Sequence, residues 1–129
     1  KDQESTSEEL NLLYGLSLWG RVTGNRALEG LGSTMLAFAA HTVQEFFLLR
    51  DGNPYHPQDF VRNHVTGVFL QGKVDYTTWF GSRSWHMHGI QMLPLSPALP
   101  LARSPEFCEE EWTDILGKED LQQIPKPWA

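Results

Sequence analysis

The stretch STSEELNLLYGLSLWGRVTGNRALEGLGSTMLAFAAHTVQEFFLL, residues 5–49, decides the fold of this 129-residue chain. It begins with the S-x-x-E pattern of a helix capping box, made by Ser5 and Glu8. Apolar residues then recur on more than one face of a helical projection. The pattern predicts a well-buried helix from Ser5 to Arg21.

A second helix is expected after a short turn. Gly24 suits the left-handed position just past a helix end, and Asn25 suits the N-cap of a new helix. Between about Ala27 and Leu49 the apolar residues follow a helical period, although two glycines weaken its first turns. Two antiparallel helices are the expected result.

The middle of the chain is irregular and partly β. DGNPYHP, residues 51–57, stops helical structure with a glycine and two prolines. Between Val65 and Phe80 the residues become β-branched and aromatic on both sides of a Gln-Gly pair, which predicts a short hairpin. Glycine and proline interrupt residues 81–100, where we expect an ordered loop.

A further helix is expected near the C-terminus. Ser104, Pro105 and Glu106 supply an N-cap, a proline at the first helical position and an acidic first turn. This helix should run to about Leu116, and the final residues IPKPWA should form a tail. The predicted fold class is mainly α with a short β-hairpin.

Composition excludes several classes of function. Sixteen acidic against ten basic residues give a net charge of −6, and no stripe of lysine or arginine offers a groove for nucleic acid. No apolar run is long enough for insertion into a membrane. Cys108 is the only cysteine, which excludes an internal disulfide and a cysteine zinc site. We expect Cys108 to be a small buried residue.

The two long helices carry more apolar surface than so short a chain can cover. A helix that is apolar on every side belongs inside a larger body. The chain also begins with Lys1 and has no signal region, which indicates processing or truncation. We therefore expect a piece of a longer helical domain whose other helices cover these faces.

Two carboxylates lie at the N-terminal end of the first predicted helix. Glu4 precedes the helix, and Glu8 lies in its first turn. In one interpretation Glu8 is the capping-box partner and Glu4 is a favourable anion near the positive end of the helix dipole. Each would then contribute about 0.3–1 kcal/mol to stability. The other interpretation notes that a helix N-terminus stabilises anions, and an ionised carboxylate is what a general base needs. The pattern alone leaves both interpretations open.

Two separated blocks carry a family resemblance. KDQESTSEELNLLYGLSLWG, residues 1–20, joins DQES and SE to a helix that ends in Leu-Trp-Gly. KVDYTTWFGSRSWHMHGIQMLPLSP, residues 73–97, contains Thr-Trp-Phe-Gly followed by a His-Gly-Ile-Gln-x-Leu-Pro run. Both resemble blocks of glycoside hydrolase family 81, in which the first is the catalytic-base motif. The resemblance spans essentially residues 1–112.

The resemblance implies a fold and an activity. Members of the family are endo-β-1,3-glucanases that cleave laminarin-like and cell-wall glucans with inversion, and an (α/α)6 barrel carries their active site. Residues 1–129 would be the C-terminal portion of that helical catalytic domain, incomplete as given and truncated at the N-terminus. The implied partner is β-1,3-glucan, no cofactor is implied, and a secreted or cell-wall location fits this substrate.

The resemblance also assigns catalytic roles. Glu4 would be the general base that activates the nucleophilic water, and Glu8 would support the water or the base. The family's general acid is an aspartate in an upstream block that this chain does not contain. An inverting enzyme needs acid and base about 6.5–9.5 Å apart on opposite sides of the bond. Two glutamates on one helical turn approach from the same side, so we expect the isolated chain to be inactive.

Aromatic residues and a histidine are candidates for substrate binding. Tyr14, Trp79 and Trp85 carry faces on which glucose rings stack, and a core role is the alternative for each. His88 matches the family's second block and either lines the cleft or is a satisfied structural histidine. His86 and His88 supply only two ligands, so no metal site is predicted.

Two other functions stay open. The chain is alternatively a non-catalytic β-1,3-glucan-binding fragment, in which case Glu4→Gln would leave its affinity for laminarin largely unchanged. As a second alternative it is a helical interaction fragment with an inert motif. Failure to bind any β-1,3-glucan would favour that last reading.

Overall fold

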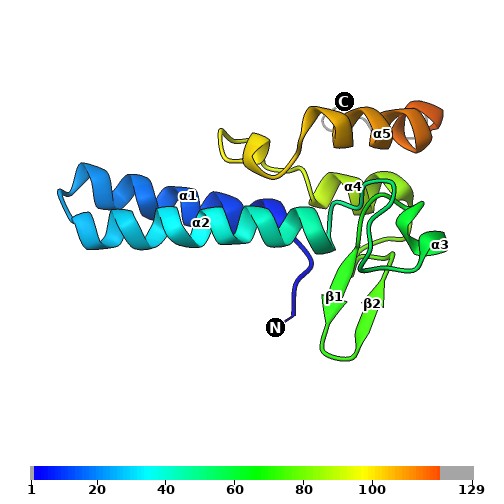
Figure 1. Cartoon of the computed structure of the whole chain (residues 1–129), viewed down its shortest axis with the longest axis horizontal. Coiled ribbons are helices and arrows are strands. Elements are labelled where there is room, and N and C mark those ends of the chain that lie inside the picture. The colour runs from blue at the N-terminus through cyan, green and yellow to red at the C-terminus, as the bar shows by residue number, and fades with distance from the viewer. Residues whose placement is uncertain (1, 120–129) are drawn as a thin grey trace.

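The structure, a computed structural model, describes residues 2–119 and is mostly helical (Figure 1). The predicted class, mainly α with a short β-hairpin, is confirmed. The expected C-terminal tail lies outside the described residues. In chain order the elements are α1 (Thr6–Val22), α2 (Arg26–Phe46), α3 (Gln58–Val61), β1 (Val68–Leu70), β2 (Lys73–Asp75), α4 (Ser84–Ile90), η1 (Leu99–Leu101), α5 (Pro105–Asp114) and η2 (Leu116–Lys118), where η denotes a 3-10 helix.

Capping residues set the ends of the antiparallel pair α1 and α2. Ser5 Oγ accepts a hydrogen bond from the Glu8 N–H at 3.3 Å, and Asn25 Oδ1 accepts one from the Leu28 N–H at 3.1 Å. Gly24, in the turn between them, has a φ of 69°, which glycine adopts without strain. Only one half of the predicted capping box forms, because the Glu8 carboxylate does not bond back to the Ser5 N–H.

Glycines bring the backbones of α1 and α2 into close contact. A Cβ on Gly32 would lie 2.5 Å from the backbone N of Ser17, and one on Gly20 would lie 2.2 Å from the backbone N of Glu29. The hydroxyl groups of Ser17 and Ser33 hydrogen-bond across the same interface at 2.8 Å. Gly32 lowers helix propensity but is required by this packing.

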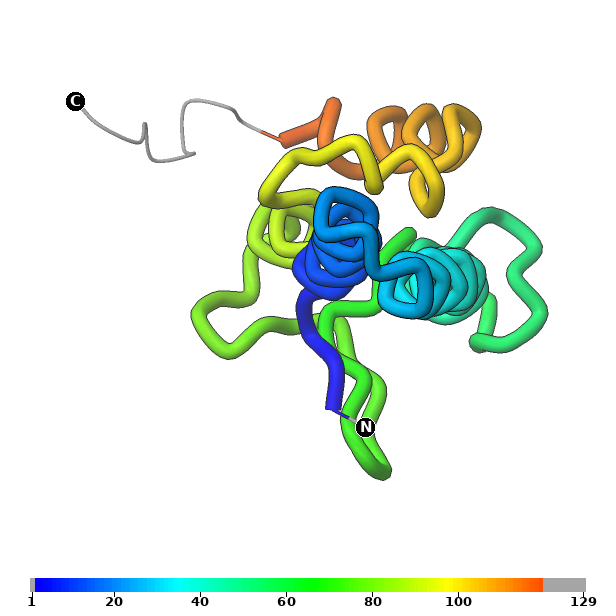
Figure 2. The backbone as a smooth tube through the Cα atoms, turned by 90° about the vertical axis from the view of Figure 1, so that its left-hand side faces the viewer, coloured from blue at the N-terminus to red at the C-terminus, as the bar shows by residue number. Residues whose placement is uncertain are grey.

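The core lies where the long helix pair meets the hairpin, α4 and α5. Figure 2 shows α4 beside α1, and the N-terminal segment running along the hairpin. Gln3 and Phe69 exchange two backbone hydrogen bonds, of 2.9 and 2.8 Å, so the segment before α1 pairs with β1. Buried apolar residues from the helices and from the segment before β1 form one cluster, against which the partly buried Phe69 of β1 packs. The cluster includes Leu10, Leu13, Leu36, Val43, Val65, Met87, Leu99 and Phe107.

The expected loop over residues 81–100 is wrong in part, because it contains α4 and η1. Met87 and His88 on α4 are buried. Tertiary packing thus stabilises α4, which the local sequence does not predict because glycine and proline lie nearby. The short helix α3 was also not predicted, and α2 ends at Phe46 rather than near Leu49.

Burial differs from the prediction at Cys108 and agrees with the expected surplus of apolar surface on α1. The side of α1 away from α2 is uncovered, with Leu12, Trp19 and Val22 exposed to 70%, 63% and 75%. Cys108 on α5 is exposed as well, because the buried face of that helix carries Phe107 and Glu111 instead. Within residues 2–119 no helix combines the length and apolar character needed to cross a membrane.

Candidate active site

The segment that carries Glu4 is fixed between the hairpin and α4. Its pairing with β1 holds it on one side. On the other side, Ser5 Oγ and Ser7 Oγ both donate to the Ile90 carbonyl at the end of α4, at 3.2 and 2.9 Å. Glu4 is therefore presented at the start of α1 by contacts with two elements far away in sequence.

The carboxylate of Glu4 contacts the loop after β2. Its Oε1 accepts a hydrogen bond from the Trp79 N–H at 2.7 Å. Glu4 is half-buried, and no lysine or arginine among residues 2–119 forms an ion pair with it. One oxygen is thus oriented by a backbone donor, while Oε2 has no partner among these residues and is free to bind a water molecule.

Trp79 joins the two sequence blocks that carry the family resemblance. Its backbone N–H contacts Glu4, and its indole is 77% exposed. Phe80, the next residue, is also exposed. The exposed indole therefore belongs to the residue whose backbone N–H holds the Glu4 carboxylate.

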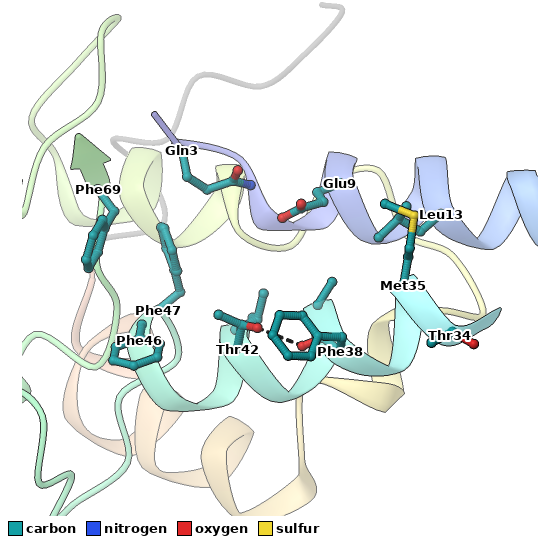
Figure 3. A pocket seen from close by; sticks show the side chains of 12 residues that line it. Gln3, Glu9, Leu13, Thr34, Met35, Phe38, Thr42, Phe46, Phe47 and Phe69 are labelled. Carbon is teal, nitrogen blue, oxygen red and sulfur yellow. Dashed lines mark hydrogen bonds between the residues drawn. The ribbon is translucent and has the colours of Figure 1, made fainter. Parts of the chain in front are cut away.

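Glu8 lies in the first turn of α1 and is exposed. Only its backbone N–H takes part in the helix cap, which leaves its carboxylate directed to solvent rather than to the Ser5 N–H. Glu9, which the sequence did not single out, lines the groove between α1 and α2 (Figure 3). The two adjacent glutamates therefore differ in their surroundings.

Tyr14 and His88 lie deeper in the fold than Trp79. Tyr14 is half-buried and packs against the core cluster. It lies eight residues after the start of α1, which is about 12 Å along the helix axis. His88 is fully buried. Its Nδ1 bonds to Glu111 Oε1 at 2.7 Å and its Nε2 bonds to the Tyr76 hydroxyl at 3.1 Å, so its contacts are those of a satisfied structural histidine.

The chain matches the model of the glycosyl hydrolase family 81 C-terminal domain over residues 1–129. It belongs to this family. Three curated relatives illustrate the match. A glucan endo-1,3-beta-D-glucosidase of Arthroderma benhamiae is 42% identical over 91% of this chain and 13% of the relative. Glucan endo-1,3-beta-D-glucosidase 2 of Saccharomyces cerevisiae is 37% identical over 99% of this chain and 16% of the relative.

The third relative is the primary septum glucan endo-1,3-beta-D-glucosidase of Schizosaccharomyces pombe. It is 35% identical over 91% of this chain and 11% of the relative. The family 81 chain therefore spans less than a fifth of the length of these proteins. Its recognition as a family 81 segment, predicted from the two sequence blocks, is confirmed.

A groove lies between α1 and α2 in this family 81 segment. It has a volume of about 680 Å³ and a mostly apolar lining that includes Leu13, Met35, Phe38, Phe47 and Phe69 (Figure 3). Gln3 also lines it, so the groove begins next to the segment that carries Glu4. Its apolar character is that of a packing surface.

A group of potential metal ligands lies elsewhere, where Asp51, His64 and Glu110 bring ligand atoms within 4.8 Å of one another. Glu110 pairs with Arg50 at 3.0 Å and accepts a hydrogen bond from the Asp51 N–H at 3.2 Å. Both ring nitrogens of His64 are bonded, to the Leu49 carbonyl and to a carboxylate on α5. These contacts engage the side chains of His64 and Glu110 without an ion, so we assign no metal to this group.

Proposed function

We propose that the protein to which this chain belongs hydrolyses internal β-1,3-glucosidic bonds of glucans and inverts the anomeric centre. Its relatives are named as glucan endo-1,3-beta-D-glucosidases, which supports the reaction class. The observation that carries the proposal is the hydrogen bond between Trp79 N–H and the Glu4 carboxylate, beside an exposed indole. This bond supports the proposal because it joins the candidate base to a residue whose exposed indole is available for stacking on a glucose ring.

The chemistry assigned to Glu4 is the activation of water. Its carboxylate takes a proton as the water oxygen forms a bond to the anomeric carbon, and the bond from that carbon to the leaving oxygen breaks. A separate acid must protonate the leaving oxygen on the opposite side of the sugar. We propose that this acid is an aspartate outside this chain.

The remaining candidate residues take supporting roles. The exposed Glu8 carboxylate would hold the attacking water or assist the base. The Trp79 indole would stack on a glucose ring at the cleavage site, and Tyr14 would border the cleft farther along α1. His88 is fully buried, so it would not touch the glucan itself. It would contribute to substrate binding only by holding the Tyr76 hydroxyl.

We also propose that the chain forms the C-terminal portion of a larger (α/α)6 catalytic domain. The uncovered apolar residues of α1 and the apolar groove support this, because both are suited to contact further helices. The substrate class favours a secreted or cell-wall location, and the septum relative is in keeping with it.

The test compares Glu4→Gln with Glu109→Gln, an exposed glutamate of α5, in the full-length protein with laminarin as substrate. Glu4→Gln should lower kcat by about 10²–10⁴-fold with little change in KM, since a general base contributes that much. Glu109→Gln should behave as the unaltered enzyme. Early products of the unaltered enzyme should be α-anomers by ¹H NMR; β-anomers would refute inversion. Laminarin binding without any hydrolysis would favour the non-catalytic alternative.

A further inference from the structure

The side chain of Gln91 links α4 to the segment that carries Glu4. Gln91 follows Ile90 at the end of α4 and is 1% exposed. Its Oε1 accepts hydrogen bonds from the N–H and the hydroxyl of Thr6, at 3.0 and 2.7 Å. Its Nε2 donates to the Glu4 carbonyl, and at 3.4 Å to the Gly67 carbonyl. These four contacts use the whole hydrogen-bonding capacity of the amide.

We infer that Gln91 is a positioning residue for Glu4, an inference that rests on the proposed role of Glu4 as the base. Glu4 lies between the backbone bridge at Gln3 and the N-cap at Ser5, and belongs to no helix or strand. The bond from Gln91 holds the carbonyl of Glu4, and the bond from Trp79 holds its carboxylate. Together they fix both ends of the residue.

The helix that carries Gln91 at its end is anchored in the core. Met87 and His88 on α4 are exposed to 1% and 0%, and His88 is bonded to Glu111 on α5. A buried amide is unfavourable unless all its polar atoms are paired. An apolar residue would fill the same space without that requirement but could not hold Glu4. Displacing a reacting group by about 1 Å lowers rates by roughly 10²-fold.

The experiment uses the full-length protein, with laminarin as substrate. Gln91→Met keeps the length of the side chain and removes its four hydrogen bonds. We expect kcat to fall by roughly 10–10²-fold, KM to stay within about twofold, and the acidic limb of the kcat against pH profile to move, because the base is displaced. Gln44→Met is the matched control. Gln44 is exposed and donates one hydrogen bond, to the Leu101 carbonyl at 3.1 Å.

A second pair of variants covers the case in which Gln91→Met does not fold. Thr6→Val removes the hydroxyl that donates to Gln91, whereas Thr6→Ser keeps it. We expect Thr6→Val to lower kcat severalfold and Thr6→Ser to keep kcat near that of the unaltered enzyme. A folded Gln91→Met with unaltered kcat would overturn the inference, as would equal kcat values for the two Thr6 variants. If Glu4→Gln is inactive in the same assay, either result overturns the role of Gln91 alone; an active Glu4→Gln overturns the proposed function.

Discussion

Tyr76, His88, Glu111 and Arg103 form a polar network inside the fold. Arg103 pairs with Glu111, whose other carboxylate oxygen is hydrogen-bonded to Nδ1 of His88 at 2.7 Å. Its Nε2 is hydrogen-bonded to the Tyr76 hydroxyl at 3.1 Å. The network ties the loop after β2 to α4 and α5, and α4 carries Gln91 at its end.

Burial, with the nearby charges of Glu119 and Glu111, raises the pKa of Tyr76 to about 12. The unfolded chain releases this proton near pH 10. The stabilising contribution is therefore complete below pH 10 and is lost as pH rises from 10 to about 12. We predict that Tyr76→Phe flattens the fall in denaturant midpoint across this window. Tyr55→Phe, at an exposed tyrosine, should leave it unchanged. The same steep fall in both variants would contradict the assignment.

Glu4 and Gln91 show what local sequence can and cannot predict. Glu4 was singled out because its motif is contiguous and matches a family block. Gln91 stands in a quoted block too, but its role depends on contacts with Thr6 and Glu4, more than 80 positions away in the chain. Helical period and capping patterns hold no information about such contacts. The sequence likewise left two roles open for His88, in the cleft or in the core, because only burial in the folded chain distinguishes them.

At the scale of the element, the α1–α2 pair follows from its sequence and α4 does not. Asn25 and Gly24 mark the turn in the chain itself, so both ends of α1 and the start of α2 fall within a residue of the prediction, whereas α2 ends three residues earlier than predicted. The stretch from Ser84 to Ile90 has no side-chain N-cap bond and contains Gly89. It is helical because its buried residues pack against the core, which only the folded chain supplies.

The close contact of α1 with α2 predicts opposite effects for two neighbouring glycines. Gly32→Ala should lower the free energy of unfolding by about 1–3 kcal/mol, because its Cβ would overlap the backbone of Ser17. Gly30→Ala meets no atom within 4 Å and should raise it by about 0.5–1 kcal/mol. Urea denaturation with matched slopes measures both. Equal effects would show that the helices do not pack through Gly32.

At the scale of the whole molecule, apolar surface remains uncovered along the long helix pair. Phe38 on α2 is exposed and lines the groove, and Leu12 and Trp19 are exposed on α1. Exposed apolar surface of this kind marks an interface. In the proposed (α/α)6 barrel, other helices of the domain would cover this surface.

The isolated 129-residue chain should fail to hydrolyse laminarin. Inverting hydrolysis needs an acid opposite the base, and the candidate residues Glu4 and Glu8 both belong to the start of α1. We expect the rate of reducing-end formation to be at least about 10²-fold below that of the full-length protein. Turnover by the isolated chain near that of the full-length protein would contradict the need for residues outside it.

The most direct measurement of the role of Glu4 is the azide rescue of Glu4→Ala in the full-length protein. Azide is already an anion and needs no base to attack the anomeric carbon. We predict that Glu4→Ala loses turnover of laminarin, that azide restores cleavage, and that ¹H NMR shows an α-glucosyl azide product, as attack from the side opposite the leaving group requires. Unimpaired turnover by Glu4→Ala in water, or a β-glucosyl azide, would contradict the assignment of Glu4 as the base.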